Sequence, residues 1–180
     1  ILDISTIATG FLIRIYAGAV VVNLHMSVWF LLTVLSASLF LAVGKRQSER
    51  TLLQGNKDIS VGETRRILTR YTERLLDQYT SMFGMATWLT YALFAFQNEI
   101  SPPERVSADI YTYLPKALHS QKLLMLSVPL VIFGVMRYLQ LIYESNKGES
   151  PETVLLQDKG LKVTVGIFGA LVMIIIYVLT

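Results

Sequence analysis

The sequence predicts an all-α fold: a bundle of membrane-spanning helices that forms a single domain over residues 1–180. Hydrophobic residues make up 53% of the chain, its mean hydropathy is +0.50, and only 16% of its residues are charged. Soluble domains usually carry about 25% charged residues. The chain also contains five apolar stretches, each close to the roughly 20 residues that cross a bilayer. We therefore expect a polytopic membrane protein without a soluble domain.

The five predicted spans cover residues 4–24, 27–43, 79–96, 123–143 and 161–179. A very short turn around Asn23 and His25 joins the first two spans, which predicts an antiparallel helical hairpin. Pro129 lies near the start of the fourth span. Before the last span, Ser150-Pro151-Glu152 is typical of a helix start, with proline in the first turn. We expect Gly160 to end that short helix.

The composition excludes several classes of site. The chain has no cysteine, which rules out disulfides, thiolate metal sites and cysteine nucleophiles. It contains no glycine-rich phosphate loop, no histidine pair with metal-ligand spacing and no Ser/His/Asp arrangement, and we expect no nucleic-acid partner. The first span lacks a basic segment ahead of its apolar core, so a cleavable signal peptide is not indicated.

A basic stretch, Gly44–Asp77, carries eight of the sixteen Lys and Arg residues. Strict alternation of the spans places loops 44–78 and 144–162 on one side, with eight and three basic residues, and loop 97–122 on the other side, with three. Loops rich in Lys and Arg stay in the cytoplasm. We therefore expect residues 44–78 to form a cytoplasmic cap loop of an inner (plasma) membrane protein. Within it, Ser60-x-x-Glu63 is a capping box that opens a basic amphipathic helix running to Asp77.

Arg14 is an unusual residue for the middle of a membrane span, where an arginine costs roughly 2.5–3.5 kcal/mol on insertion scales. It should therefore face the bundle interior or a wet cavity. Asp3, Ile7, Gly10, Arg14 and Gly18 share one helical face that is small and polar. One interpretation is a cation reaching into a cavity that holds phosphate or diphosphate. The other is a buried arginine paired with a carboxylate on another helix.

The end of the second span carries Lys45 and Arg46, which suit either a topology signal or an anion site. Glu49 and Asp77 could bind Mg²⁺, since that ion typically takes one or two carboxylates together with substrate phosphates. Asp77 could equally neutralise Arg70 or Arg74, one or two turns before it.

Two further charged pairs lie near the fourth and fifth spans. Arg137-Tyr138 places a second cation inside a span, about two turns before its end, where it could contact substrate or extend to the membrane surface. Asp158-Lys159 precedes the last span, and a solvated loop pair is the simplest interpretation.

Five segments of the chain, in order, carry a family resemblance: LDI…GFLIRIYAG, LFLAVGKRQSE, LTRYTERLLDQ, FGVMRYLQL and SPETVLLQDKGL. Together they resemble the UbiA superfamily of intramembrane prenyltransferases, and within it the branch of decaprenyl-phosphate phosphoribosyltransferases. The GKR-x-S-E and RY-x-x-x-LLDQ patterns are fairly specific to that branch. The resemblance covers nearly the whole chain.

The resemblance implies nine transmembrane helices around a central cavity that opens to the cytoplasm, with this chain as the second half. It implies Mg²⁺-dependent transfer of a phosphoribosyl group from phosphoribosyl diphosphate to a polyprenyl phosphate, which supplies a precursor of cell-wall arabinose units. On this interpretation the basic residues bind substrate phosphates, and the acidic and tyrosine residues support them or bind the metal. The phosphate-binding set is Arg14, Lys45, Arg46, Arg70 and Arg137, and the supporting set is Asp3, Glu49, Tyr71, Asp77, Tyr138 and Asp158.

The chain departs from the superfamily pattern in its acidic residues. The main Asn-Asp-x-x-Asp metal motif is absent, and loop 44–78 contains no Asp-x-x-x-Asp. We therefore expect an N-terminal half, in the same or a separate chain, to complete the site. Two alternatives stay open at this point: a superfamily enzyme with an aromatic acceptor, or a non-catalytic membrane subunit whose basic loop binds anionic lipid.

Overall fold

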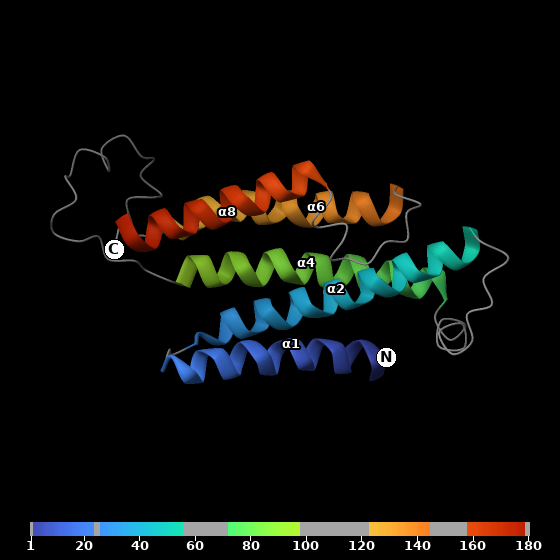
Figure 1. The fold of residues 1–180 in the computed structure, drawn as a ribbon, viewed down its shortest axis with the longest axis horizontal. Coiled ribbons are helices and arrows are strands. Elements are labelled where there is room, and N and C mark those ends of the chain that lie inside the picture. The colour runs from blue at the N-terminus through green and yellow to red at the C-terminus, as the bar shows by residue number, and fades with distance from the viewer. Residues whose placement is uncertain (1, 24–25, 56–71, 98–122, 145–157, 179–180) are drawn as a thin grey trace.

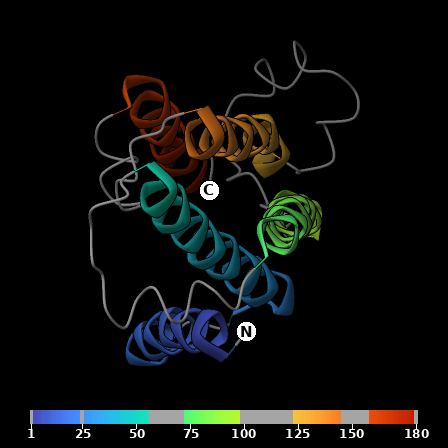
Figure 2. The same ribbon diagram turned by 90° about the vertical axis from the view of Figure 1, so that its right-hand side faces the viewer.

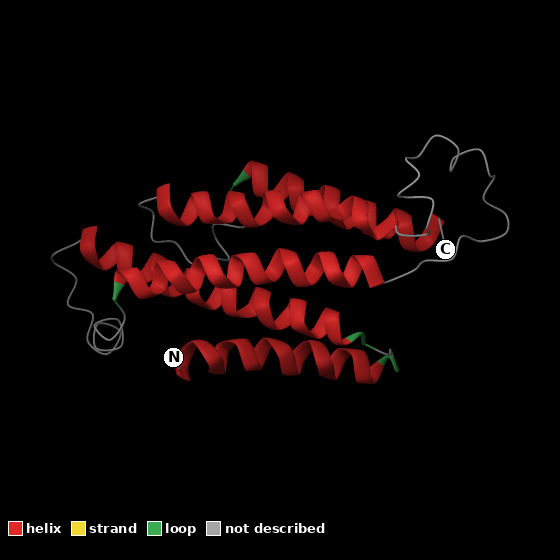
Figure 3. Cartoon of the chain, turned by 180° about the vertical axis from the view of Figure 1, so that it is seen from behind, coloured by secondary structure: helices red, strands yellow, loops and turns green. Residues whose placement is uncertain are grey.

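The computed structural model describes residues 2–23, 26–55, 72–97, 123–144 and 158–178. Every regular element within these ranges is a helix, and they contain no strand (Figure 3). The predicted all-α fold is confirmed. The basic amphipathic helix predicted from Ser60 lies almost wholly outside the described residues, apart from its last turn.

The described helices run alternately up and down along one long axis (Figure 1). They are α1 (Leu2–Val21), α2 (Val28–Gly55), α4 (Glu73–Gln97), the short 3-10 helix η1 (Leu123–Ser127) that leads into α6 (Val128–Glu144), and α8 (Lys159–Val178). α4 packs against α2 and against α6, α6 pairs with α8, and α1 packs mainly against α2 (Figures 1 and 2).

Among the described residues, four helical segments are long and apolar enough to cross a membrane: 2–21, 28–49, 123–143 and 159–176. They correspond to four of the five predicted spans. The third prediction, residues 79–96, lies within α4, which is a helix of sufficient length but is not among these four. α4 is less apolar because it carries threonines on its buried face. The Thr80 and Thr87 hydroxyls donate to the carbonyls of Leu76 and Phe83, one turn earlier, so their polarity is satisfied inside the helix.

Two predicted boundaries are wrong. The second span was expected to end at residue 43, but α2 continues without a break through Gly44 to Gly55. The residues after Gly44 are mostly good helix formers, so the change from apolar to polar sequence changes the helix surface and does not end the helix. Gly160 was expected to end a short helix, but it lies in the first turn of α8.

The turn between α1 and α2 agrees with the predicted hairpin. The Asn23 amide donates to the Val20 carbonyl at 3.1 Å, and Asn23 has a φ of 56°. Asparagine adopts this left-handed conformation more readily than most other residues with a side chain, and it commonly ends helices there. α1 and α2 therefore lie antiparallel, side by side (Figure 1).

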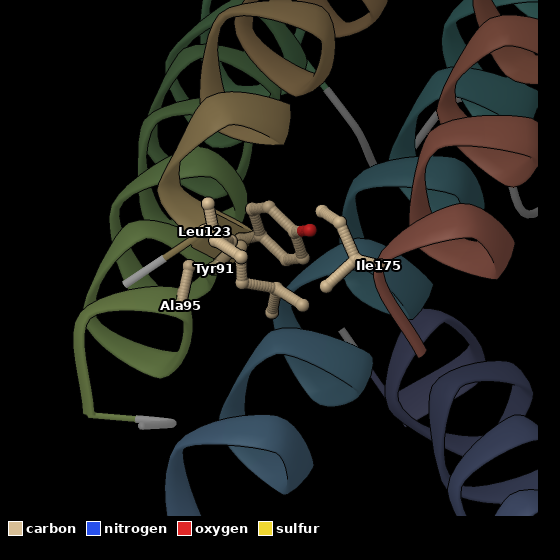
Figure 4. Close-up of a cluster of buried hydrophobic side chains, with 5 residues drawn as sticks. Tyr91, Ala95, Leu123 and Ile175 are labelled. Carbon is tan, nitrogen blue, oxygen red and sulfur yellow. The ribbon is translucent and has the colours of Figure 1, made fainter. Parts of the chain in front are cut away.

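The buried core forms three clusters along the bundle. One joins α4, η1 and α8 through Tyr91, Ala95, Leu123 and Ile175 (Figure 4). The Tyr91 hydroxyl lies 2.6 Å from the Ser127 Oγ, so the polar end of this buried ring has a partner. Many large apolar side chains elsewhere are exposed, including Val21 and Met136. An apolar outer surface is what lipid contact requires.

Candidate functional site

Five helix ends meet at one end of the bundle: the starts of α1, α4 and α8 and the ends of α2 and α6 (Figure 1). Most of the charged residues singled out in the sequence lie there. This arrangement agrees with the strict alternation used to assign loops 44–78 and 144–162 to the same side. We call this region the polar end; it includes Asp3, Lys45, Arg46, Gln47, Glu49, Asp77, Arg137, Tyr143 and Asp158, together with the exposed cations Arg74, Lys159 and Lys162.

Arg46 is held between two carboxylates. Its Nη2 forms an ion pair with Asp3 Oδ2 at the start of α1, and its Nη1 donates to Glu49 Oε2 at 2.5 Å, one turn along α2. The Arg46 side chain is only 12% exposed. The arginine therefore joins α1 to α2. Its counter-ions, Asp3 and Glu49, are two of the carboxylates that were expected to support the substrate-binding residues or bind the metal.

Asp77 joins three helices. Its Oδ1 accepts hydrogen bonds from Gln47 Nε2 on α2 at 3.0 Å and from the Tyr143 hydroxyl on α6 at 2.9 Å. Of the two arginines expected to be neutralised by Asp77, Arg74 is exposed and forms no ion pair with it among the described residues, and Arg70 lies outside them. Sequence reasoning missed Gln47 and Tyr143. A glutamine in the middle of GKRQSE and a tyrosine at the end of a span were the available signals.

Arg137 and Asp158 form a two-point ion pair between α6 and the start of α8. Arg137 Nη2 lies 2.8 Å from Asp158 Oδ2 and Nε lies 3.3 Å from Oδ1. Asp158 Oδ1 also accepts from the Leu161 amide at 2.7 Å, so Asp158 is the N-cap of α8. The interpretation of Asp158-Lys159 as a solvated loop pair is therefore wrong. The Arg137 guanidinium and the Leu161 amide hold the pKa of the Asp158 carboxyl below its ordinary value of 3.8.

We expect the Asp158–Arg137 pair to make stability depend on pH in the acid range. A carboxyl whose pKa is lowered by folding stabilises the fold above its unfolded pKa, and this contribution is lost as pH falls through the lowered folded pKa. Asp158→Asn should therefore lower stability by roughly 0.5 kcal/mol at pH 7, since asparagine keeps the cap but not the ion pair. The deficit should begin to shrink as pH falls below about 4, the unfolded pKa, and should be lost as pH falls through the lowered folded pKa. Unfolding in detergent at pH 7 and pH 3 measures it, and an equal deficit at both pH values would contradict it.

Lys45 is one of four described cations at this end of the bundle for which no ion pair is found, the others being Arg74, Lys159 and Lys162. Those three side chains are exposed, whereas the Lys45 side chain is half-buried. Successive residues on a helix are turned by about 100°. On α2, Gln47 faces α4, Gly44 faces α6 and Arg46 faces α1, which leaves Lys45 on the side opposite α4. Figure 2 shows no described helix on that side of α2.

Arg14 does not face the interior of the described bundle, contrary to expectation. Its side chain is exposed on α1, and its guanidinium lies 5.8 Å from the centroid of the Phe11 ring. Because α1 packs mainly against α2, the face that carries Gly10, Arg14 and Gly18 is left open among the described helices. Arg70 and Tyr71 lie outside the described residues.

A hollow lies at the opposite end of the bundle. It has a volume of about 870 Å³ and lies between the end of α1, the start of α2 and the end of α4. Trp29, Phe30 and Phe94 line it, and the Phe30 and Phe94 rings are 5.3 Å apart. Its described lining is mostly apolar and includes no charged side chain, so the polar end is the better candidate for binding phosphates.

The described residues do not assemble a metal site. No group of three or more Asp, Glu, His or Cys side chains lies close enough together within these ranges to hold an ion. The four carboxylates of the polar end are engaged by Arg46, by Gln47 and Tyr143, or by Arg137. The described part of the chain therefore does not fit Mg²⁺ without carboxylates from elsewhere.

Comparison with known proteins identifies relatives of one kind. The chain is 31% identical over 176 residues to a protein from Mycolicibacterium smegmatis named decaprenyl-phosphate phosphoribosyltransferase, which covers 94% of this chain and 50% of that protein. A Corynebacterium glutamicum protein of the same name is 29% identical over 91% of this chain and 43% of its own length. The chain is a homologue of part of these transferases. It spans about half the length of the curated relatives it matches. No protein-family model matches it.

Proposed function

We propose that this chain is part of an integral membrane transferase that moves a phosphoribosyl group from phosphoribosyl diphosphate to a polyprenyl phosphate. The observation that carries the proposal is the similarity, over 94% of the chain, to a protein named for that kind of transfer. In the reaction, a phosphate oxygen of the acceptor bonds to C1 of the ribose while the bond from C1 to the diphosphate breaks. Diphosphate leaves with the electron pair. The product would serve as a precursor of cell-wall arabinan.

The geometry of the polar end supports different roles for its cations. Arg46 and Arg137 are engaged by carboxylates of this chain, so they hold α1, α2, α6 and α8 in place. Lys45 is half-buried and lies on the side of α2 that no described helix covers. A preorganised cation offsets the negative charge that develops on a leaving diphosphate. We assign that role to Lys45. Arg14, on the open face of α1, has a supporting role in this proposal.

The rest of the proposal concerns the whole protein. The UbiA-type architecture of nine helices, with the polar end in the cytoplasm of an inner-membrane protein, would place Lys45 at the mouth of a central cavity. The apolar helix surfaces suit the polyprenyl tail of the acceptor. Mg²⁺ stays a prediction for the complete enzyme, because the carboxylates described here are engaged in other contacts.

The test is an assay of the full-length protein in detergent or liposomes. Labelled phosphoribosyl diphosphate is supplied with polyprenyl phosphate, and in a parallel reaction labelled prenyl diphosphate is supplied with an aromatic acceptor. Label in a polyprenyl lipid in the first reaction supports the proposal. Label only in the second reaction would replace it with an aromatic prenyltransferase. Activity in neither, together with binding to anionic liposomes, would favour a non-catalytic subunit.

A further inference from the structure

α2 and α6 meet closely at Gly44. A Cβ atom added at Gly44 would lie 2.7 Å from the Tyr138 hydroxyl oxygen, 2.9 Å from Ile142 Cδ1 and 3.1 Å from Tyr138 Cε1. The first two distances are shorter than side-chain contacts allow, so only glycine fits between the two helices as they stand. Tyr138 is 3% exposed and Ile142 is 4% exposed, which gives the contact little room to relax.

Tyr138 also packs against a second residue of α2. The Tyr138 ring packs edge-on against Phe40, with the ring centroids 5.1 Å apart and the planes at 64°. Phe40 lies one turn before Gly44 on α2, so Tyr138 is fitted against two successive turns of that helix. Tyr138 and Ile142 are likewise one turn apart on α6. The contact therefore fixes how far α6 can slide along α2.

The contact is next in sequence to the cations of the polar end. Gly44 is followed directly by Lys45 and Arg46, and Tyr138 is preceded by Arg137. Arg137 in turn holds Asp158 at the start of α8. A shift of a few tenths of an ångström between Gly44 and Tyr138 would therefore move the backbone that carries Lys45 on α2 and Arg137 on α6. The ion pair between Arg137 and Asp158 would move with it.

We infer that Gly44 and Tyr138 form a positioning contact that sets Lys45, relative to the Arg137–Asp158 pair, for binding of the donor's phosphates. This inference rests on the proposed function. Neither residue touches substrate in it: both act through the position of Lys45, which the Arg137–Asp158 pair on the neighbouring helices helps to fix. It explains why a glycine, which weakens the middle of a helix, occupies this position in α2.

The test uses Gly44→Ala in the full-length protein, with Gly134→Ala as the matched control. Gly134 is a helical glycine of α6 around which an added Cβ would meet nothing within 4 Å. Alanine favours helices more than glycine does, so both substitutions should be harmless or stabilising if local preference alone decides. We expect Gly44→Ala to raise the KM for phosphoribosyl diphosphate by about tenfold, and Gly134→Ala to leave it within about twofold.

A rescue experiment separates positioning from general damage. Tyr138→Phe removes the hydroxyl oxygen and Ile142→Val removes Cδ1, the two atoms that an alanine at position 44 would meet first. The variant carrying all three substitutions should regain most of the lost donor affinity, whereas the KM for polyprenyl phosphate should change little throughout. If Gly44→Ala has wild-type kinetics, or if the triple variant is no better than Gly44→Ala, the inference is wrong. Absence of transfer by the wild-type protein would instead overturn the proposed function.

Discussion

Arg46→Met in the full-length protein is expected to lower the free energy of unfolding by about 3 kcal/mol. The substitution leaves Asp3 and Glu49 facing each other without the cation that both contact. Their side chains are 34% and 26% exposed, so water reaches them only in part. Two partly buried carboxylates that lose their shared counter-ion repel each other and cannot both be solvated. Titration of the purified protein with SDS in mixed micelles measures the loss.

The matched control removes all three charges. A variant with Asp3→Asn, Arg46→Met and Glu49→Gln should lie within about 1 kcal/mol of the wild type, because neutral groups of similar shape leave no unpaired charge. If Arg46→Met alone is as stable as the wild type, the ion pairs of Arg46 with Asp3 and Glu49 have no stabilising role. If the triple variant is as unstable as the single one, the loss comes from packing and not from charge.

The fold class could be predicted because the membrane simplifies it. Long apolar stretches have few alternatives to helices in lipid, where each backbone polar group needs a partner within its own segment. The ends of helices were harder. Hydropathy falls sharply at Gly44, yet α2 continues to Gly55, since hydropathy reports what surrounds a helix and not where its hydrogen bonds stop. α4 is a helix as predicted but is less apolar, and its threonines bond to the backbone of their own helix.

The sequence predicted which residues belong to the site, but not which of them contact one another. From charge type and the alternation of the spans, Asp3, Arg46, Arg137 and Asp158 could be predicted to lie toward one end of the bundle. Sequence spacing carries no information on which carboxylate on one helix meets which arginine on another, so both arginines were read as phosphate ligands. Arg14 was expected to face inward because of its cost in lipid. The described helices leave it exposed.

Lys45→Met in the full-length protein is expected to lower kcat/KM for phosphoribosyl diphosphate by about 100-fold, the usual effect of removing one preorganised group that stabilises developing negative charge. Stability should change little, because no described carboxylate depends on Lys45 as Asp3 and Glu49 depend on Arg46. Methionine preserves most of the length and the apolar stem of the lysine in its half-buried position. Steady-state kinetics with the donor varied at saturating polyprenyl phosphate measure the effect.

Lys162→Met provides the control, since Lys162 is an exposed lysine in the first turn of α8, at the same end of the bundle. A general loss of positive charge near the site would lower kcat/KM in both variants, and the effect would shrink at high salt because exposed charges are screened. A local role predicts a loss with Lys45→Met alone, nearly independent of salt. Equal losses in the two variants would reduce Lys45 to part of the basic surface that orients the protein in the membrane. A loss confined to Lys45 would separate the cation that meets substrate from Arg46 and Arg137, which hold the helices around it.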